Sequence, residues 1–255
     1  MEITILGAHH SETATTKLVS ILIDDVLAVD AGSLTSALSL PQQEKVRSIL
    51  LSHHHYDHIR DIPTIALNNY WRSIKVYGTA LTIDMLSSHL LDGKIYPKFT
   101  ETPSRQKPVL RLFTLEPYNV QTIDGYSVLP LPVSHSVPTV GYQITPPGGK
   151  SLFYSSDTGP GLSACWEHVS PQLLIINLTL PNRLEDIAIK ERHLTPRLLK
   201  AELVQFQRSK GYLPPVVVIH LNPQVEEEIR AELGQLANEI GTTITLGYQG
   251  MGLTV

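Results

Sequence analysis

Thirteen short apolar runs alternate along the chain with polar turns and a few longer amphipathic segments. The runs are rich in Val, Ile, Leu and Tyr and are bounded by Gly, Pro, Asp or Asn, which is typical of β-strands. They predict strands at residues 3–6, 18–23, 26–30, 48–51, 75–77, 109–115, 120–123, 126–133, 140–145, 151–155, 173–177, 216–220 and 243–246. The sequences Asp24-Asp25 and Pro147-Gly148-Gly149 predict tight turns between neighbouring strands.

Four segments carry apolar residues at helical spacing, namely residues 59–68, 80–91, 195–208 and 223–240. The third opens with a helix-start signal, because Thr195 can cap the first turn and Pro196 suits the first helical position. Strands come first in each half of the chain, and helices follow. This order predicts an α/β fold in which two sheets pack face to face with helices outside, a four-layer αββα sandwich.

The segment at residues 92–108 differs from the rest of the chain, because it is polar, contains three prolines and has no periodicity. Long loops in compact proteins tend to be functional, so we expect an ordered loop or a lid over another part of the molecule. No internal repeat, low-complexity tract or linker interrupts the sequence. The sequence therefore predicts one domain at residues 1–255.

Composition narrows the class of protein. The 255 residues are 42% hydrophobic and 17% charged, which is the balance of a soluble, well-packed globule and not of a disordered chain. Cys165 is the sole cysteine, which rules out an internal disulfide and a cysteine zinc site. The first residues predict a strand and not a signal peptide, and no apolar run reaches the length of a membrane span. We expect a cytoplasmic protein without a membrane partner.

Charge narrows the choice of partner. The net charge of −4 and the lack of a basic run longer than two residues argue against a nucleic acid partner. They do not argue against a small anionic substrate, because a bound metal ion can supply positive charge locally. Histidine is the residue type whose count stands out, with eleven in the chain.

The strongest chemical signal is the run HHHYDH at residues 53–58, which directly follows the predicted strand at 48–51. Imidazole nitrogens and carboxylate oxygens are good ligands for zinc and other first-row divalent ions. Two adjacent metals fit the spacing better than one, because a single tetrahedral ion would use these groups awkwardly in a tight turn. A solvated histidine-rich loop is the alternative, but the buried strand before the run and the helix after it argue against that.

The pattern His-x-His-x-Asp-His after a buried strand resembles the metallo-β-lactamase superfamily. The later metal ligands of that family have counterparts near the ends of predicted strands, in the right order, at His135, Asp157 and His220. An upstream aspartate of the family is matched by Asp30. The resemblance runs from about residue 3 to residue 250, and it implies the metallo-β-lactamase fold.

The resemblance also implies a centre with two divalent metal ions. One ion would be bound by His53, His55 and His135, the second by Asp57, His58 and His220, and Asp157 would bridge both. Asp30 would accept a hydrogen bond from a ligand histidine, because coordinating imidazoles usually donate their outer N–H to a carboxylate. Zinc is the expected metal for a histidine-rich site, with manganese and iron as alternatives.

Two residues indicate the branch of the superfamily. Asp157 stands where true β-lactamases mostly carry a cysteine, and a bridging carboxylate is typical of dinuclear hydrolases such as glyoxalase II-like thioesterases and phosphodiesterases. His193, in the run HLTP, resembles the His-Leu-Ser/Thr-Pro segment of class II cyclic-nucleotide phosphodiesterases and the His-Ser/Thr segment of RNase Z-like tRNA 3′-endonucleases. Residues 30–34, 93–100 and 108–111 also match the phosphodiesterase branch.

By this resemblance we expect hydrolysis of a small phosphodiester such as a cyclic nucleotide, with a metal-bridging hydroxide as the nucleophile. His193 would contact a non-bridging phosphate oxygen or protonate the leaving alkoxide, and either role suits an imidazole. Asp57 and His193 are the candidate catalytic residues. Dimers are common among the related proteins, so the resemblance makes a homodimer one option, but the sequence does not determine the oligomeric state.

Two departures from the family pattern leave the substrate open. Residues 59–63 (IRDIP) replace a Gly-Leu or Ala-Gly-Leu segment, and the long basic, glycine-rich arm with which the endonucleases grip tRNA is missing. A thioester or lactone hydrolase on the same metals is one alternative, with His193 as a spectator. A metal-binding sensor without turnover is another.

Several other side chains have plainer interpretations. His9 and His10 lie in the loop after the first predicted strand and could line the substrate pocket. We expect His54 to point away from the metals. Trp71 and Trp166 could stack on a base, although packing is the more common use of tryptophan.

Overall fold

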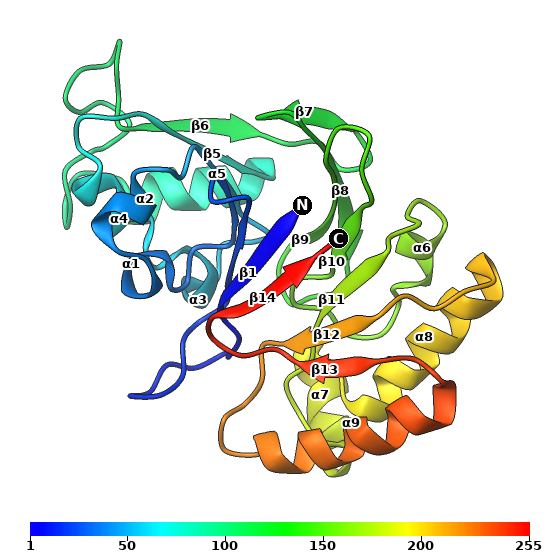
Figure 1. Ribbon diagram of the computed structural model, residues 1–255. Helices are drawn as coiled ribbons and strands as arrows, with labels where there is room; N and C mark the ends of the chain where they lie inside the picture. Colours follow the sequence, from blue (N-terminus) through cyan, green and yellow to red (C-terminus); the bar gives the residue numbers. More distant parts are fainter.

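The computed structural model describes residues 1–255 and contains two seven-stranded mixed sheets (Figure 1). The strands of the first sheet are, in spatial order, β14 (Met251–Thr254), β1 (Glu2–Gly7), β2 (Ser20–Ile23), β3 (Leu27–Val29), β4 (Ser48–Leu50), β5 (Ile74–Gly78) and β6 (Leu110–Thr114). Neighbouring strands from β3 to β6 run parallel. The two ends of the chain meet in this sheet, where β14 pairs antiparallel with β1.

The second sheet has the same number of strands. In spatial order they are β13 (Ile244–Leu246), β12 (Val216–Ile219), β11 (Leu173–Asn177), β10 (Leu152–Tyr154), β9 (Thr139–Thr145), β8 (Tyr126–Val133) and β7 (Gln121–Ile123). Strands β10 to β13 run parallel, whereas β7, β8 and β9 form an antiparallel meander.

Helices cover the outer face of each sheet (Figure 1). Those beside the first sheet are α1 (Leu34–Ala37), α2 (Leu40–Gln43), α3 (Tyr56–Ile59), α4 (Ile62–Asn68), α5 (Ala80–Met85) and the π-helical turn η1 (Leu86–Leu90). Those in the second half of the chain are α6 (Ser163–Trp166), the 3₁₀ turn η2 (Asn182–Leu184), α7 (Glu185–Glu191), α8 (Pro196–Lys210) and α9 (Glu226–Ile240).

Three hydrophobic clusters hold these layers together. One lies between the sheets and joins residues of the first, such as Ile5 and Val29, to residues of the second, such as Val128 and Ile175. The other two lie between a sheet and its helices. Burial of apolar surface on both faces of both sheets is the main force that favours this arrangement. The predicted four-layer αββα sandwich is therefore confirmed.

The strand prediction is confirmed for all thirteen apolar runs, with ends that differ by no more than two residues. The central runs are apolar throughout because parallel strands are covered on both faces, and every residue of β11 is buried. The cap of α8 is also as predicted, since the Thr195 hydroxyl accepts a hydrogen bond from the Leu198 N–H (3.3 Å).

The helix prediction is wrong in its details. Residues 59–68 form no single helix, because the Asp61 N–H donates to the Ala31 carbonyl (2.8 Å) and Pro63 stands in the first turn of a new helix, α4. The segment at 80–91 changes from α5 to a π-helical turn after Met85. The last helix, α9, begins at Glu226 and not at residue 223.

Several elements are not predicted from the sequence, namely the short helices α1, α2 and α6, the turn η2, the strand β14 and the helix α7. The strand β14 contains Gly252 and has no buried residue, so it shows no apolar run. In α7 only Ala188 is buried, while Ile187 and Ile189 are half exposed, and the helix therefore lacks an apolar stripe. None of the helices combines the length and the apolar character needed to cross a membrane.

Gly32 permits a close contact that positions α3. A Cβ atom at this position would lie 2.1 Å from the Asp57 carbonyl oxygen, so α3 would have to move. We expect Gly32→Ala to lower the free energy of unfolding by about 1–3 kcal/mol, as overpacking does, and this can be measured by urea denaturation. The control is Gly234→Ala on α9, where a Cβ meets nothing within 4 Å and should be neutral or stabilising. Equal stability of Gly32→Ala and the wild type would contradict the close contact.

Candidate metal centre

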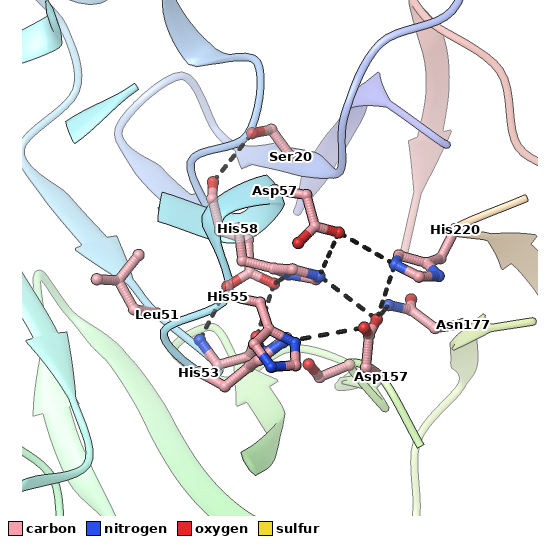
Figure 2. A network of polar contacts seen from close by, with 12 residues as sticks. Ser20, Leu51, His53, His55, Asp57, His58, Asp157, Asn177 and His220 are labelled. Atoms are coloured by element: carbon pink, nitrogen blue, oxygen red, sulfur yellow. Dashed lines mark hydrogen bonds and ion pairs between the residues drawn. The ribbon is translucent and has the colours of Figure 1, made fainter. Parts of the chain in front are cut away.

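The seven predicted ligand side chains converge at one edge of the sandwich, although they are spread from residue 53 to residue 220. Figure 2 labels all of them except His135. His53 and His55 lie in the loop after β4, and Asp57 and His58 lie on α3. The others follow strands of the second sheet, with His135 after β8, Asp157 after β10 and His220 after β12. Because the two sheets pack face to face, the loops that follow these strands meet at this edge.

The side chains form two groups, each with ligand atoms within 4.8 Å of one another. One group contains His53, His55, His135 and Asp157, and the other contains Asp57, His58, Asp157 and His220. Asp157 is the shared member, and its two oxygens face different groups. Its Oδ2 lies 3.6 Å from His135 Nε2 and 3.9 Å from His53 Nε2, whereas its Oδ1 lies 3.2 Å from His220 Nε2 and 3.4 Å from His58 Nε2.

Asp57 completes the second group. Its Oδ2 lies 3.3 Å from His220 Nε2 and 3.5 Å from His58 Nε2. Within the first group, His55 Nδ1 lies 3.2 Å from His135 Nε2. The inner nitrogens and carboxylate oxygens therefore face a shared space from all sides, as Figure 2 shows for the residues around Asp157.

Hydrogen bonds hold the outer nitrogens of the histidines and so fix which nitrogen faces inward. His58 Nδ1 lies 2.7 Å from Asp30 Oδ2, and His220 Nδ1 lies 2.7 Å from the Thr179 hydroxyl. His53 Nδ1 lies 3.0 Å from the Ser52 hydroxyl. Such outer-shell partners orient metal-binding imidazoles and set their tautomer.

Asp30 serves as the acceptor that the sequence indicates. Besides His58, its carboxylate accepts hydrogen bonds from the Ser52 N–H (2.8 Å), the Ser52 hydroxyl (2.9 Å) and the Tyr154 hydroxyl (2.8 Å). Asp157 is held in a similar way, since Asn177 Nδ2 donates to its Oδ1 at 2.7 Å. Both carboxylates are therefore fixed before any ligand binds.

The donor set fits divalent cations. The Nε2 atoms of His53 and His58 are buried and have no hydrogen-bond partner in the protein. A buried polar atom without a partner costs about 1–3 kcal/mol, so these two nitrogens need a partner that the protein itself does not supply. Nitrogen and carboxylate oxygen are the ligands that zinc and related ions accept.

The pKa values of the site reflect the crowding of charges. Burial alone would raise the pKa of Asp157, but His220 and His58 outweigh burial and hold that pKa well below its usual range. Burial would also raise the pKa of Asp57, but His58 and His220 lower it to about 2. For His58, burial would lower the pKa, but Asp157 and Asp30 outweigh burial and raise the pKa well above its usual value. Both carboxylates are therefore ionised at neutral pH.

A cavity of about 570 Å³ opens over the two groups, and His193 and His10 line it. The His193 ring lies between the two ligand groups, with its centre 5.4 Å from the centre of the His135 ring and 5.3 Å from that of the His220 ring. The His10 ring lies 5.7 Å from the His220 ring. Burial and the neighbouring His220 lower the pKa of His193 to about 3, so this ring is neutral at neutral pH.

Some of the expected lining residues are absent from this cavity. His9 forms an ion pair with Glu226 (2.9 Å) instead, and none of residues 92–108 reaches the cavity. The segment at 92–108 is thus an ordered loop elsewhere in the molecule and not a lid over this centre. Sequence reasoning misses Thr179 and Asn177, which orient His220 and Asp157, because their only signal is a position at the end of β11.

Comparison with known proteins agrees with this geometry. A family model described as "Beta-lactamase superfamily domain" matches residues 20–221. A relative from Yersinia pestis, named "Probable 3′,5′-cyclic-nucleotide phosphodiesterase", is 25% identical over 261 residues, which cover 86% of this chain and 73% of the relative. The family match spans more than half of the chain and confirms the resemblance inferred from the sequence.

Solved structures share the fold. Unliganded yeast PDE1 superposes with a TM-score of 0.83 at 20% identity and covers 100% of this chain and 99% of its own. The metallo-β-lactamase fold protein YhfI from Bacillus subtilis reaches 0.77 at 18% identity, with 99% of each chain covered. Human tRNase Z, short form, reaches 0.70 at 17% identity and covers 100% of this chain and 99% of its own. This chain belongs to the β-lactamase superfamily and is a hydrolase with the metallo-β-lactamase fold.

Proposed function

We propose that the protein hydrolyses a small phosphodiester, such as a cyclic nucleotide, at a centre of two divalent metal ions. The observation that carries the proposal is the position of His193, between the two candidate ligand groups and facing their shared cavity. A thioester or lactone presents one developing oxyanion, whereas a phosphodiester presents two non-bridging oxygens, one for the metals and one for a separate donor. The similarity to the Yersinia pestis relative supports the same reaction.

The two ligand groups would each hold one ion, and Asp157 would contact both. His53, His55 and His135 would bind the first, and Asp57, His58 and His220 the second. Two such ions, when bound, lower the pKa of water and neutralise charge on a phosphoryl group. Zinc suits the five imidazoles of this set, and manganese or iron would also accept its nitrogen and oxygen donors.

The charge of the cavity favours a substrate with a single negative charge. No lysine or arginine lines the cavity, and Glu191 is one of its walls. The negative charge of a substrate must therefore be balanced at the metal centre itself. A phosphodiester carries one negative charge there, whereas a phosphomonoester carries nearly two at neutral pH.

His193 would bind the phosphoryl group as a neutral hydrogen-bond donor. Its low pKa means that it holds one ring proton, which it can donate to a non-bridging oxygen. Donors aimed at an oxygen that gains charge in the transition state contribute strongly in a buried site. Of the two roles considered for His193, the contact with phosphate oxygen is the one that a neutral ring can fill.

The binding of zinc should release a proton from His58. Its raised pKa means that metal-free protein holds this proton at neutral pH, and the proton must leave before Nε2 can bind a cation. We expect zinc affinity to rise with pH until His58 loses its proton, with about one proton released per protein at neutral pH. Calorimetric titration in two buffers of different ionisation enthalpy measures that number. The exposed His89→Ala serves as a control and should leave it unchanged; zinc affinity that falls as pH rises would refute the assignment.

Substitutions in the site test the reaction itself. With bis(p-nitrophenyl) phosphate and 3′,5′-cyclic AMP as substrates, Asp157→Ala should lower kcat/KM by about a thousandfold or more, because neither ligand group stays complete. His193→Ala should cost about 10²–10³-fold, as the loss of one transition-state donor does. His193→Gln should recover part of that loss, since the amide also donates a hydrogen bond without carrying charge.

The same assay includes a control and the results that would contradict the proposed reaction. His89→Ala, which changes an exposed histidine outside the cavity, should leave kcat/KM unchanged. Cleavage of thioesters or lactones by a protein that leaves every phosphodiester intact would show that the reaction is acyl transfer. An unchanged rate for His193→Ala would remove the observation on which the proposal rests.

A further inference from the structure

A second cavity of about 400 Å³ lies away from the metal centre and shares no lining residue with it. One wall is the turn after α4, at residues 70–73. The other wall comes from the segment at 103–111, which leads into the edge strand β6 (Figure 1). The polar, proline-rich segment singled out in the sequence thus builds this second cavity, which we call the outer pocket.

The outer pocket collects unpaired positive charge. Twelve of the 20 lysine and arginine side chains form ion pairs, and three of the other eight, Arg72, Lys107 and Arg111, line this one pocket. No carboxylate lines it. The nearby Glu101 is already engaged by Lys98 (2.5 Å) and Arg105 (2.8 Å). In a protein with a net charge of −4, this local excess of positive charge would attract an anionic ligand.

An exposed aromatic ring stands beside these cations. Trp71 is 87% exposed, the highest exposure of any large hydrophobic side chain in the protein. Its ring is braced on one side by Tyr70, whose ring meets it edge-on at 83° with centres 4.9 Å apart. A large apolar ring that is held in place yet left in water is a stacking surface for another flat ring.

The pocket is formed by the protein's own hydrogen bonds. The Ser73 hydroxyl donates to the Pro108 carbonyl (2.9 Å) and the Ile74 N–H to the Val109 carbonyl (2.8 Å), so the two walls are joined. The Val109 N–H donates to the Thr102 carbonyl (2.8 Å), which closes the loop at 103–108 on itself. Preformed walls lower the entropy cost of binding.

We propose that the outer pocket binds a nucleoside monophosphate, with its phosphate among Arg72, Lys107 and Arg111 and its base stacked on Trp71. Guanidinium groups bind phosphate through paired, charge-assisted hydrogen bonds. Inorganic phosphate would use the cations and leave the ring bare, whereas a mononucleotide uses both. A pocket of this volume lies in the range of small-molecule sites. The site is separate from the catalytic centre and does not depend on the proposed reaction.

Tryptophan fluorescence tests the proposal directly. The chain has two tryptophans, and Trp166 is only 1% exposed, so quenching of the solvent-exposed emission reports on Trp71. We expect AMP to quench this emission with half-saturation on the order of 0.1–1 mM, and adenosine to do so at least about tenfold more weakly. Inorganic phosphate should compete with AMP without quenching. Trp71→Phe should abolish the signal and identify its source.

Paired variants locate the phosphate. Arg111→Gln should weaken AMP binding by about tenfold or more, whereas Arg208→Gln, which removes an unpaired arginine from α8, should leave it unchanged. Asp157→Ala should also leave it unchanged, which separates this site from the metal centre. No quenching by AMP up to about 10 mM, equal quenching by adenosine, or full binding by Arg111→Gln would each overturn the proposal. So would quenching by an RNA oligonucleotide alone, since the ligand would then be a strand.

Discussion

The position of the Asp157 carboxylate between two sets of imidazoles is the constraint on which the rest of the structure depends. The Asp157 carboxylate is buried, and its two oxygens face different groups of histidines. A buried charge without compensation costs several kcal/mol, so positive charge must lie close to both oxygens. In the protein alone a proton on His58 supplies part of it, because the pKa of His58 is raised. Two bound cations would supply positive charge next to both oxygens of Asp157. The same geometry is therefore suited to a metal centre.

The fold meets this constraint by bringing strand ends from both sheets to one edge and by anchoring each imidazole from behind. His220 and Asp30 follow β12 and β3 with positive φ angles of 64° and 56°, a conformation that non-glycine residues rarely adopt. Strain of this kind persists where surrounding contacts over-determine the backbone. At both residues the side chain makes a buried hydrogen bond, to Thr179 and to His58. The strained backbone conformation therefore occurs at Asp30 and His220, the two residues whose side chains are held in a fixed direction by these hydrogen bonds.

The strands and the metal-ligand candidates could be predicted from the sequence, and the reason is physical. Parallel strands are buried on both faces and so appear as apolar runs, and the ligand-type residues come at or shortly after the ends of those runs. The helices are harder to predict. The Asp61 N–H donates a hydrogen bond to the Ala31 carbonyl, which is distant in sequence, and Ile187 and Ile189 of α7 are exposed to water. The hydrogen bonds of Thr179 and Asn177 join residues 41 and 20 positions apart, and no local pattern encodes them. The outer pocket could not be predicted from the sequence for the same reason, since its two walls come together only in the folded chain.

Positive charge is divided unevenly between the two cavities, and this division has a consequence for function. The cavity over the metal centre has no lysine or arginine, whereas the outer pocket has three such residues and no carboxylate. An anion near Asp57 and Asp157 meets two ionised carboxylates, so it is repelled until cations occupy the centre. Anion binding at the candidate metal centre would therefore depend on metal occupancy. Anion binding at the outer pocket would depend on permanent side-chain charges and would not require metal. If both proposals hold, anion affinity would depend on metal supply at the candidate metal centre, whereas at the outer pocket it would depend on side-chain charges that salt screens.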